Sequence, residues 1–404
     1  MFSSLKNEYV KSMVVGIILL NFLIGLLALV NFIPISAIQS NVYTSIEDLN
    51  KEKEEKSIWK SPDLNADAVV MNIALNKECS VDSVFKPKHL GITTSKYLIQ
   101  LNSYLDGDET VNEYVQYWHG YRVLWYPLFT VLSIKGILAL AFTIVLLLIL
   151  VTSYLISKDS WIFGMVWFTA SSIFLLSSCV SLEYVPVTLI TLISTLLILR
   201  SKPTLTNFIC IGIVTMFFDF LTAETLTFTI PYLITLWKYK TSIKDGIKFG
   251  LGWLLGYAGT LGYKYLLMTI IYQENYFTKV KTIFEEHFEN YSNGISVAMQ
   301  MNLIVVLGEC VMKYLWVVAL LAVVTIVVTF IFRCKSMSDS YWLQLCVLCT
   351  IPYLRYAVLD THSLLLYYFT YRAQMVVPLC LYIMMYDNEL VRLCKKKIGR
   401  GLIK

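Results

Sequence analysis

Long apolar runs alternate with short polar segments along most of the chain. A helix needs about 20 apolar residues to cross a hydrocarbon layer about 30 Å thick. The first run extends from Met13 to about Pro34, and the others lie at about 136–156, 160–180, 184–199, 204–218, 224–237, 249–271, 301–331, 341–358 and 364–386. Because the bilayer interior offers no partners to backbone amides, such segments span it as helices. The pattern predicts an all-α integral membrane protein with roughly ten transmembrane helices.

Two of the runs have features of their own. The 301–331 run is too long for one crossing, and Lys313 indicates that its first part is an external or interfacial helix. The 249–271 run is unusually rich in glycine, at positions Gly250, Gly252, Gly256, Gly259 and Gly262. Small residues at this density indicate close packing against a neighbouring helix.

The longest polar segment follows the first apolar run. We expect the chain to consist of four parts. Residues 1–34 form a cytoplasmic N-terminus and the first transmembrane helix. Residues 35–135 form a large extracytoplasmic loop with amphipathic, interfacial helices, and the aromatic stretch around Trp118 fits a belt at headgroup depth. Residues 136–388 form the multi-span bundle, and residues 389–404 form a basic cytoplasmic tail.

The loop contains a short helical pattern at residues 61–76. A serine and a proline at its start suit the N-cap and the first turn of a helix. Asp63 and Asp67 lie four residues apart on one face, which continues with Asn72, while apolar residues share the other face. This predicts an amphipathic helix on the bilayer surface and makes Asp67 the candidate catalytic base. The alternative is that Asp63 only stabilises the helix N-terminus and Asp67 is solvated.

Basic residues gather in alternate short loops, and cytoplasmic loops collect Lys and Arg in membrane proteins. One set of loops, with the C-terminal tail, carries Lys158, Arg200, Lys202, Lys238, Lys240, Lys244, Lys248, Arg333, Lys335, Lys395, Lys396, Lys397 and Arg400. The alternate loops carry none, which predicts cytoplasmic termini and an outward-facing loop 35–135. The 57% hydrophobic and 15% charged residues exclude a soluble globular protein. A net charge of +5 gives no indication of a nucleic-acid partner.

With this topology, the unusual polar residues fall at or near the outer face, and they are Asp67, His119, Glu183, Asp219, Glu224, Glu309, Asp360 and His362. Three cations, Lys264, Arg355 and Arg372, lie within spans at the outer third. Ionisable groups there cost several kcal/mol unless they are paired or hydrated. The three cations describe a pocket for an anionic lipid headgroup, because Arg binds phosphate oxygens bidentately. The alternative is that each cation pairs with an acid inside the bundle.

Several segments carry a resemblance to known proteins: residues 67–76, 117–121, 217–222, 352–356 and 362–372. With one span, a large external loop and many further spans, the chain resembles the GT-C class of polytopic glycosyltransferases. The segments resemble, more particularly, bacterial membrane proteins of cell-surface polysaccharide assembly. This implies a location in the bacterial plasma membrane and a polyprenyl-phosphate-linked sugar donor used at its outer side. No metalloprotease, serine hydrolase, Walker or dinucleotide motif is present.

The resemblance also implies roles for individual residues. Asp67 becomes the base that activates an acceptor hydroxyl, with Glu47 and Asp48 as rivals because a charged run separates Asp67 from the first span. The donor phosphate is assigned to Arg372, Arg355, Lys264 and His362. The acceptor or sugar is assigned to Asp63, Asn72, Trp118, His119 and Asp219.

The expected reaction is a hexosyl transfer to a cell-surface glycan or a lipid-linked acceptor. It is a single displacement that inverts the anomeric carbon, with a carboxylate as base and cations on the leaving phosphate. No ligand cluster in the sequence demands a metal, although Mg²⁺ or Mn²⁺ is compatible with the chemistry. The partners are then the lipid donor, the acceptor and membrane lipids. A polysaccharide polymerase and a lipid-linked glycan flippase or transporter stay open, although a transporter usually shows internal repeats and none is evident.

Overall fold

The computed structural model describes residues 2–54, 64–94, 96–219, 221–279, 281–282, 339–359 and 367–386. Helices predominate among them, with one small sheet. Two predicted site residues, Asp63 and His362, lie outside the described residues. So do the 301–331 run, Glu309 and Asp360.

The helices are α1 (Phe2–Val30), α2 (Ile35–Glu54), α3 (Leu64–Leu75), α4 (Val81–Phe85), α5 (Tyr97–Leu105), α6 (Arg122–Phe129), α7 (Ile134–Ser157), α8 (Trp161–Phe174), α9 (Val185–Arg200), α10 (Leu205–Phe218), α11 (Leu226–Tyr239), α12 (Ile243–Tyr272), α16 (Asp339–Val358), α18 (Tyr367–Thr370) and α19 (Val376–Tyr386). Two 3₁₀ helices are η1 (Leu176–Val180) and η2 (Tyr371–Met375). The strands β1 (Lys88–Leu90) and β2 (Val111–Glu113) pair antiparallel, with His89 opposite Asn112.

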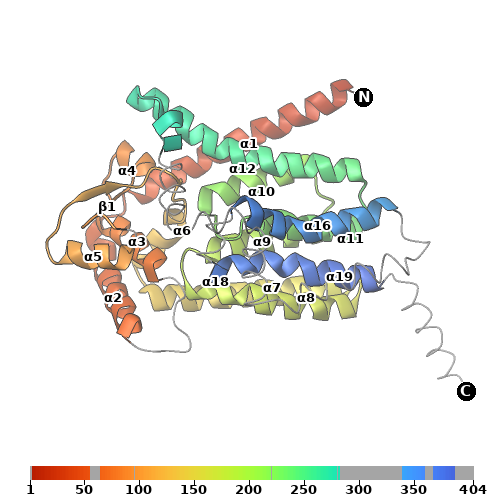
Figure 1. The fold of residues 1–404 in the computed structure, drawn as a ribbon, viewed down its shortest axis with the longest axis horizontal. Helices are drawn as coiled ribbons and strands as arrows, with labels where there is room; N and C mark the ends of the chain where they lie inside the picture. The colour runs from red at the N-terminus through yellow and green to blue at the C-terminus, as the bar shows by residue number, and fades with distance from the viewer. Residues whose placement is uncertain are drawn as a thin grey trace, which may run out of the picture.

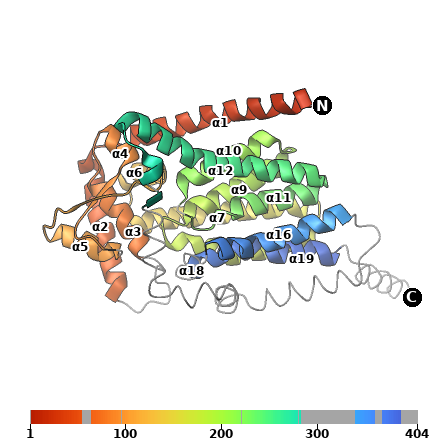
Figure 2. The same ribbon diagram turned by 45° about the horizontal axis from the view of Figure 1, so that its top comes forward.

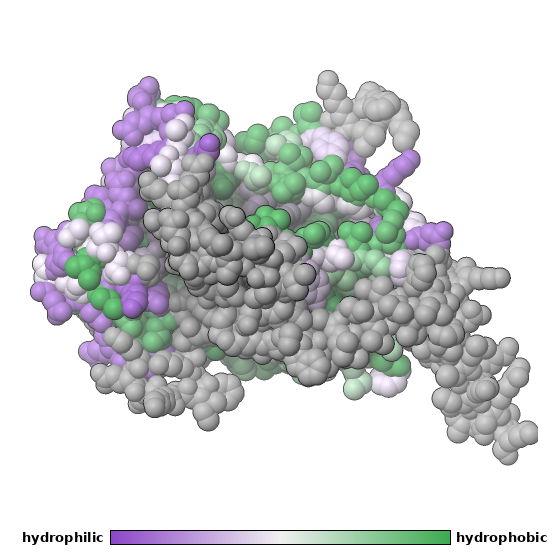
Figure 3. Space-filling view, viewed as in Figure 1, coloured by the Kyte–Doolittle hydropathy of each residue, from purple (hydrophilic) through white to green (hydrophobic). Residues whose placement is uncertain are grey.

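The elements form a helical bundle with a smaller polar part at one of its ends (Figures 1 and 2). The polar part contains α2–α6 and both strands, and it lies between α1 and α7 in the chain. Figure 3 shows hydrophilic residues gathered over this part and hydrophobic residues over the bundle helices. The polar loop predicted from the sequence is thus a folded unit that rests on the bundle.

Within the polar part, α2 and α3 differ sharply. α2 is amphipathic, with Ile38, Val42 and Ile46 buried at helical spacing along one face. α3 has no exposed face, because every residue from Ala66 to Leu75 is buried. It packs against α2, α5 and β1. The prediction that α3 lies on the bilayer surface is therefore wrong, since α3 is a core helix of the polar part.

From α7 to α12, successive bundle helices run in opposite directions, so their connections alternate between two ends (Figure 2). At one end, Lys238 of α11 lies 3.7 Å from Asp159 in the α7–α8 connection. At the same end, Lys248 of α12 lies 3.1 Å from Glu8 of α1. The connections after η1 and α10 lie at the opposite end, beside the polar part. Among the described residues, the loops that carry basic residues are therefore collected at the end away from the polar part.

Three of the described helices are long and apolar enough to cross a membrane: Glu8–Val30, Ile134–Ser157 and Trp161–Val180. Large apolar side chains such as Phe22 and Leu147 are exposed on them, as expected for contact with lipid. Other apolar helices of the bundle, such as α10, are shorter than the roughly 20 residues that a crossing needs. The mainly helical class is confirmed in the described part of the chain, where the candidate spans are three and not ten.

Glycines allow α10 and α12 to approach closely. A Cβ atom on Gly256 would lie 2.2 Å from the carbonyl oxygen of Ile209, and one on Gly212 would lie 2.1 Å from that of Trp253. The close packing predicted for the 249–271 run is confirmed at this crossing. Gly259 and Gly262 do not take part, since no described atom lies within 4 Å of a Cβ placed there.

Candidate functional site

The aromatic segment around Trp118 is inserted into the end of the bundle. The Trp118 side chain is fully buried, and its Nε1 donates a hydrogen bond to the carbonyl oxygen of Thr260 at 2.9 Å. His119 has a left-handed backbone with φ of 55°. The next residue, Gly120, donates its backbone N–H to the carbonyl oxygen of Phe217 at 3.0 Å, and a Cβ there would lie 2.3 Å from that oxygen. Only glycine fits this approach. The aromatic segment is therefore buried in the protein rather than forming an interfacial belt, and we refer to residues 114–121 as the plug.

Two buried cations hold the plug through its backbone carbonyls. Lys264 donates to the carbonyl oxygen of Val115 at 2.8 Å and to that of Tyr117. Arg122 is fully buried, and its Nε donates to the carbonyl oxygen of His119 at 3.1 Å while Nη1 and Nη2 donate to carbonyl oxygens of α4. Arg122 is a site residue that was not predicted from the sequence. The sequence feature that could have identified it is a cation inside the aromatic run from Trp118 to Trp125.

Arg355 forms a buried ion pair. Its Nε lies 2.8 Å from Oε1 of Glu224, and its Nη2 lies 3.2 Å from Oε2 and 2.6 Å from the carbonyl oxygen of Leu221. Both side chains are nearly inaccessible, with exposed fractions of 2% and 7%. Arg355 therefore pairs with an acid inside the bundle, which was the alternative to a phosphate site.

Asp219 caps the end of α10 and begins the α10–α11 connection. Its carboxylate accepts hydrogen bonds from the backbone N–H and the hydroxyl of Thr222, the latter at 2.7 Å. Burial, followed by the nearby charge of Glu224, raises the pKa of Asp219 to about 6. The side chain is 3% exposed and is used mainly to shape this turn.

Asp67 links the polar part to the bundle. It lies in the first turn of α3 and is fully buried. Its Oδ1 accepts hydrogen bonds from the Ser181 hydroxyl and the Leu182 backbone N–H, both at 2.9 Å. These two residues belong to the short connection between η1 and α9. The predicted catalytic base therefore contacts a connection that is more than 100 residues away in the sequence.

Arg372, in η2, binds the other end of the same connection. Its Nε donates to the carbonyl oxygen of Phe369 at 3.0 Å, and Nη1 donates to that of Tyr184 at 3.3 Å. The guanidinium carbon lies 4.8 Å from the centre of the Tyr184 ring. The side chain is 1% exposed, yet Nη2 has no hydrogen-bond partner among the described residues. A buried guanidinium nitrogen without an acceptor is costly, so a missing acceptor is expected at this point.

Glu183 lies between these two anchors and is half-buried. Its charge acts on three tyrosines of the aromatic segment: it adds to the effect of burial in raising the pKa of Tyr114, Tyr117 and Tyr121. Glu183 was predicted from the sequence to lie at the outer face, without a role. The sequence feature that could have identified Glu183 is that it is the single acid in a short connection free of Lys and Arg.

The remaining predicted site residues serve the polar part itself. Asn72 exchanges hydrogen bonds with the backbone of Leu90, at 2.7 and 2.8 Å, and so holds β1 against α3. Burial lowers the pKa of His119 well below its ordinary value, and its Nε2 lies 3.0 Å from the carbonyl oxygen of Tyr114.

The rival acids of α2 are bound to lysines. Glu47 lies 3.9 Å from Lys51 on the helix surface, and Asp48 lies 2.8 Å from Lys135 at the start of α7. Neither contact involves the connection that Asp67 and Arg372 hold. We refer to Asp67, residues 181–184 and Arg372 as the outer-end cluster, after the outer face that the sequence predicts for this end of the bundle.

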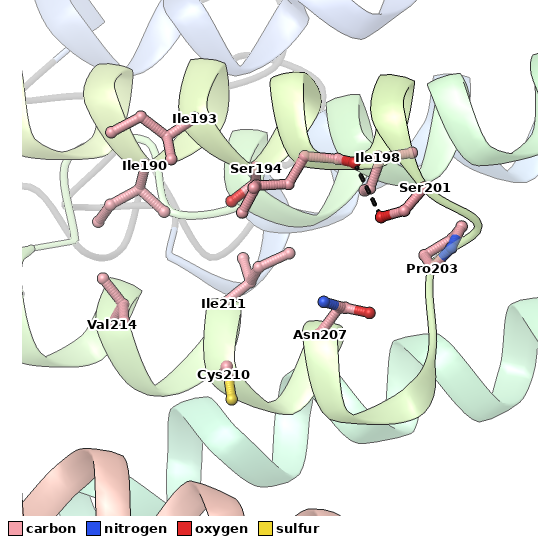
Figure 4. Close-up of a pocket in the computed structure, with 11 residues that line it drawn as sticks. Ile190, Ile193, Ser194, Ile198, Ser201, Pro203, Asn207, Cys210, Ile211 and Val214 are labelled. Carbon is pink, nitrogen blue, oxygen red and sulfur yellow. Dashed lines mark hydrogen bonds between the residues drawn. The ribbon is translucent and has the colours of Figure 1, made fainter.

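A cavity of about 220 Å³ lies elsewhere, between α9 and α10 (Figure 4). It is lined mainly by apolar side chains such as Ile190 and Val214, and it reaches the basic connection at Ser201 and Pro203. It contains no ionisable side chain of the outer-end cluster. Among the described residues, no three His, Cys, Asp or Glu side chains come together as a metal site.

Comparison with known proteins gives no indication of function. No protein-family model, no curated protein and no solved structure matches this chain. The outer-end cluster contains one half-buried carboxylate, one fully buried carboxylate and one buried arginine whose Nη2 has no acceptor among the described residues. It is therefore the feature that points to a function.

Proposed function

We propose that the protein is a membrane glycosyltransferase that takes a sugar from a polyprenyl-phosphate carrier and transfers it to a cell-surface glycan or lipid-linked acceptor. Arg372 would bind the carrier phosphate. A carboxylate of the outer-end cluster would receive the proton of the acceptor hydroxyl. The support comes from the residues themselves, since no relative carries the assignment.

The unfilled Nη2 of Arg372 is the observation that carries the proposal. Of the three cations predicted to bind phosphate, Arg355 is neutralised by Glu224. Lys264 donates to two carbonyl oxygens of the plug. Arg372 alone among these three has a buried nitrogen with no acceptor in the described part of the chain. A phosphate oxygen is an acceptor that arginine binds strongly, and it would remove the cost of the unpaired nitrogen.

The surroundings suit a lipid-linked substrate. The outer-end cluster lies where the apolar bundle meets the polar part, so a carrier lipid can keep its chain beside the bundle while its phosphate reaches Arg372. In this proposal the chain crosses the plasma membrane about ten times. Its basic end and both termini face the cytoplasm because cytoplasmic loops collect Lys and Arg, and the outer-end cluster faces outward.

Binding of the carrier phosphate tests the proposal directly. The full-length protein in detergent is titrated with undecaprenyl phosphate and, separately, with undecaprenol, which has the same chain without the phosphate. We expect Arg372→Gln to weaken undecaprenyl phosphate binding about tenfold to a hundredfold, because a hydrogen bond to a charged group contributes about 1.5–3 kcal/mol. Binding of undecaprenol should not change.

The matched control is Arg200→Gln, which removes an exposed arginine at the other end of the bundle. It should leave both affinities as in the wild-type protein. Equal binding of undecaprenyl phosphate by Arg372→Gln and wild type, with unchanged melting of the variant, would contradict the phosphate role.

The surface glycan of cells that lack the protein distinguishes transfer from its alternatives. Loss of one sugar from an otherwise full-length polymer is the result expected for a glycosyltransferase. Loss of all long polymer with unchanged branching would instead indicate a polymerase or a flippase.

A further inference from the structure

We propose that Glu183 is the general base of the transfer and that Asp67 is a positioning residue that fixes Glu183 in place. This inference rests on the proposed function. It assigns the proton transfer to a connection between two bundle helices rather than to the first helix after the charged run of the polar part.

The connection that carries Glu183 is fixed on both sides. Before it, the Ser181 hydroxyl and the Leu182 backbone N–H both donate to Asp67 at 2.9 Å. After it, the Tyr184 carbonyl oxygen accepts from Arg372 at 3.3 Å. The Ser181 side chain and the backbone groups of Leu182 and Tyr184 are thus tied to two buried charged side chains. Glu183 lies between these contacts.

Access separates the two carboxylates. A general base must come within about 2.6–3.2 Å of the hydroxyl oxygen whose proton it takes. Asp67 has no exposed surface and already accepts two hydrogen bonds through Oδ1. Glu183 is half-buried, so a hydroxyl can reach it without rearrangement of α3. The buried carboxylate is suited to holding the backbone and the half-buried one to chemistry.

The position of Glu183 also fits the leaving group. Only one peptide unit separates it from Tyr184, whose carbonyl oxygen and ring hold Arg372. A donor with its phosphate on Arg372 would place its anomeric carbon within reach of the same connection. Around Glu183, the half-buried Tyr114 and Tyr117 supply hydroxyls and ring faces of the kind that sugars contact.

The step balances in atoms and charge. The acceptor hydroxyl gives its proton to Glu183 as its oxygen bonds to the anomeric carbon. The bond from that carbon to the phosphate oxygen breaks, and the oxygen keeps the electron pair. Glu183 becomes neutral, and the released polyprenyl phosphate carries one more negative charge than the donor did. Arg372 stabilises this additional charge at the leaving oxygen.

Turnover of the reconstituted full-length protein tests this assignment. The donors are undecaprenyl-phosphate hexoses with a labelled sugar, and the acceptor is membranes from cells that lack the protein. We expect Glu183→Gln to lower kcat by about 10²- to 10⁴-fold, the usual contribution of a general base. The KM for the donor should stay within a few fold of the wild-type value, because Arg372 is unchanged.

Rescue by azide is a second measurement, and it distinguishes loss of the base from loss of folding. It is a nucleophile without a proton to remove, so it does not need the base. In Glu183→Ala, azide should restore release of polyprenyl phosphate and form a glycosyl azide of inverted configuration. In Arg372→Gln, azide should restore nothing, because the leaving group is no longer stabilised.

The pH profile separates the base from the positioning residue. The acid limb of kcat/KM should disappear in Glu183→Gln and persist in Asp67→Asn, which lowers kcat but keeps Glu183. Loss of the limb in Asp67→Asn with near wild-type turnover of Glu183→Gln would overturn the inference and make Asp67 the base. Absence of transfer by the wild-type protein from every donor, despite intact undecaprenyl phosphate binding, would overturn the proposed function as well.

Discussion

Arg372 and Tyr184 contact each other in two ways. Nη1 of Arg372 donates to the Tyr184 carbonyl oxygen at 3.3 Å, and the guanidinium carbon lies 4.8 Å from the centre of the Tyr184 ring. The ring and the carbonyl group thus hold the guanidinium from two sides. Nη2, which has no acceptor in the described part of the chain, is therefore held in place by contacts of the rest of the guanidinium, as a phosphate site requires.

The Tyr184 ring is expected to contribute to phosphate binding through Arg372. A cation–π contact contributes about 0.5–2 kcal/mol, so Tyr184→Leu should weaken undecaprenyl phosphate binding by about twofold to thirtyfold. Tyr184→Phe keeps the ring and the carbonyl group and should bind like the wild-type protein. Titration of the three proteins with the same lipid measures this, and an equal loss in both variants would assign the effect to the hydroxyl group instead.

The crossing of α10 and α12 gives a matched pair of glycine substitutions on one helix. Gly256→Ala forces a Cβ to within 2.2 Å of the Ile209 carbonyl oxygen, whereas Gly259→Ala meets no described atom within 4 Å. We expect Gly256→Ala to destabilise the protein by about 1–3 kcal/mol through overpacking and Gly259→Ala to have no destabilising effect. The apparent melting temperature in detergent measures both, and similar melting of the two variants would contradict the packing at this crossing.

The sequence singled out several ionisable residues of the outer-end cluster but could not show which of them are paired. Arg372 and Arg355 stood out because charge within an apolar run is costly. Whether such a charge is paired depends on the fold: Arg355 meets Glu224 across 131 positions of sequence, while Nη2 of Arg372 meets no acceptor in the described residues. Periodicity cannot report contacts of this kind.

The burial of α3 shows the same limit. Its spacing of polar residues predicted an amphipathic surface helix, yet Asn72 is buried against Leu90 and Asp67 against Ser181. Both side chains are buried because each finds backbone or hydroxyl partners from distant segments. In the sequence, a buried polar residue with tertiary hydrogen-bond partners cannot be distinguished from a solvated one.

Asp219 should make stability depend on pH. Its pKa is raised from 3.8 to about 6 in the folded protein, so the unfolded chain loses this proton first as pH rises. The free energy of unfolding should therefore fall between about pH 4 and pH 6, by roughly 3 kcal/mol for a shift of about two units, and then stay level. Asp219→Asn lacks this contribution. If the melting temperatures of the two proteins differ by a constant amount from pH 4 to pH 7, the raised pKa is wrong.

The pair of Arg355 and Glu224 should be structural rather than catalytic. Removing one member of a buried pair leaves an uncompensated charge and costs about 3–5 kcal/mol, whereas replacing both with apolar residues is often nearly neutral. We therefore expect Arg355→Met to lower the apparent melting temperature strongly and Arg355→Met with Glu224→Met to recover most of the loss.

A surface pair and a binding measurement complete this test. Lys135→Met, which breaks the contact with Asp48, should change stability by less than about 1 kcal/mol, because the lysine is 58% exposed. The protein with both Arg355 and Glu224 replaced should still bind undecaprenyl phosphate with wild-type affinity if Arg372 holds the phosphate. Loss of that affinity in the stable double variant would move the phosphate site from Arg372 to Arg355, at the same end of the bundle.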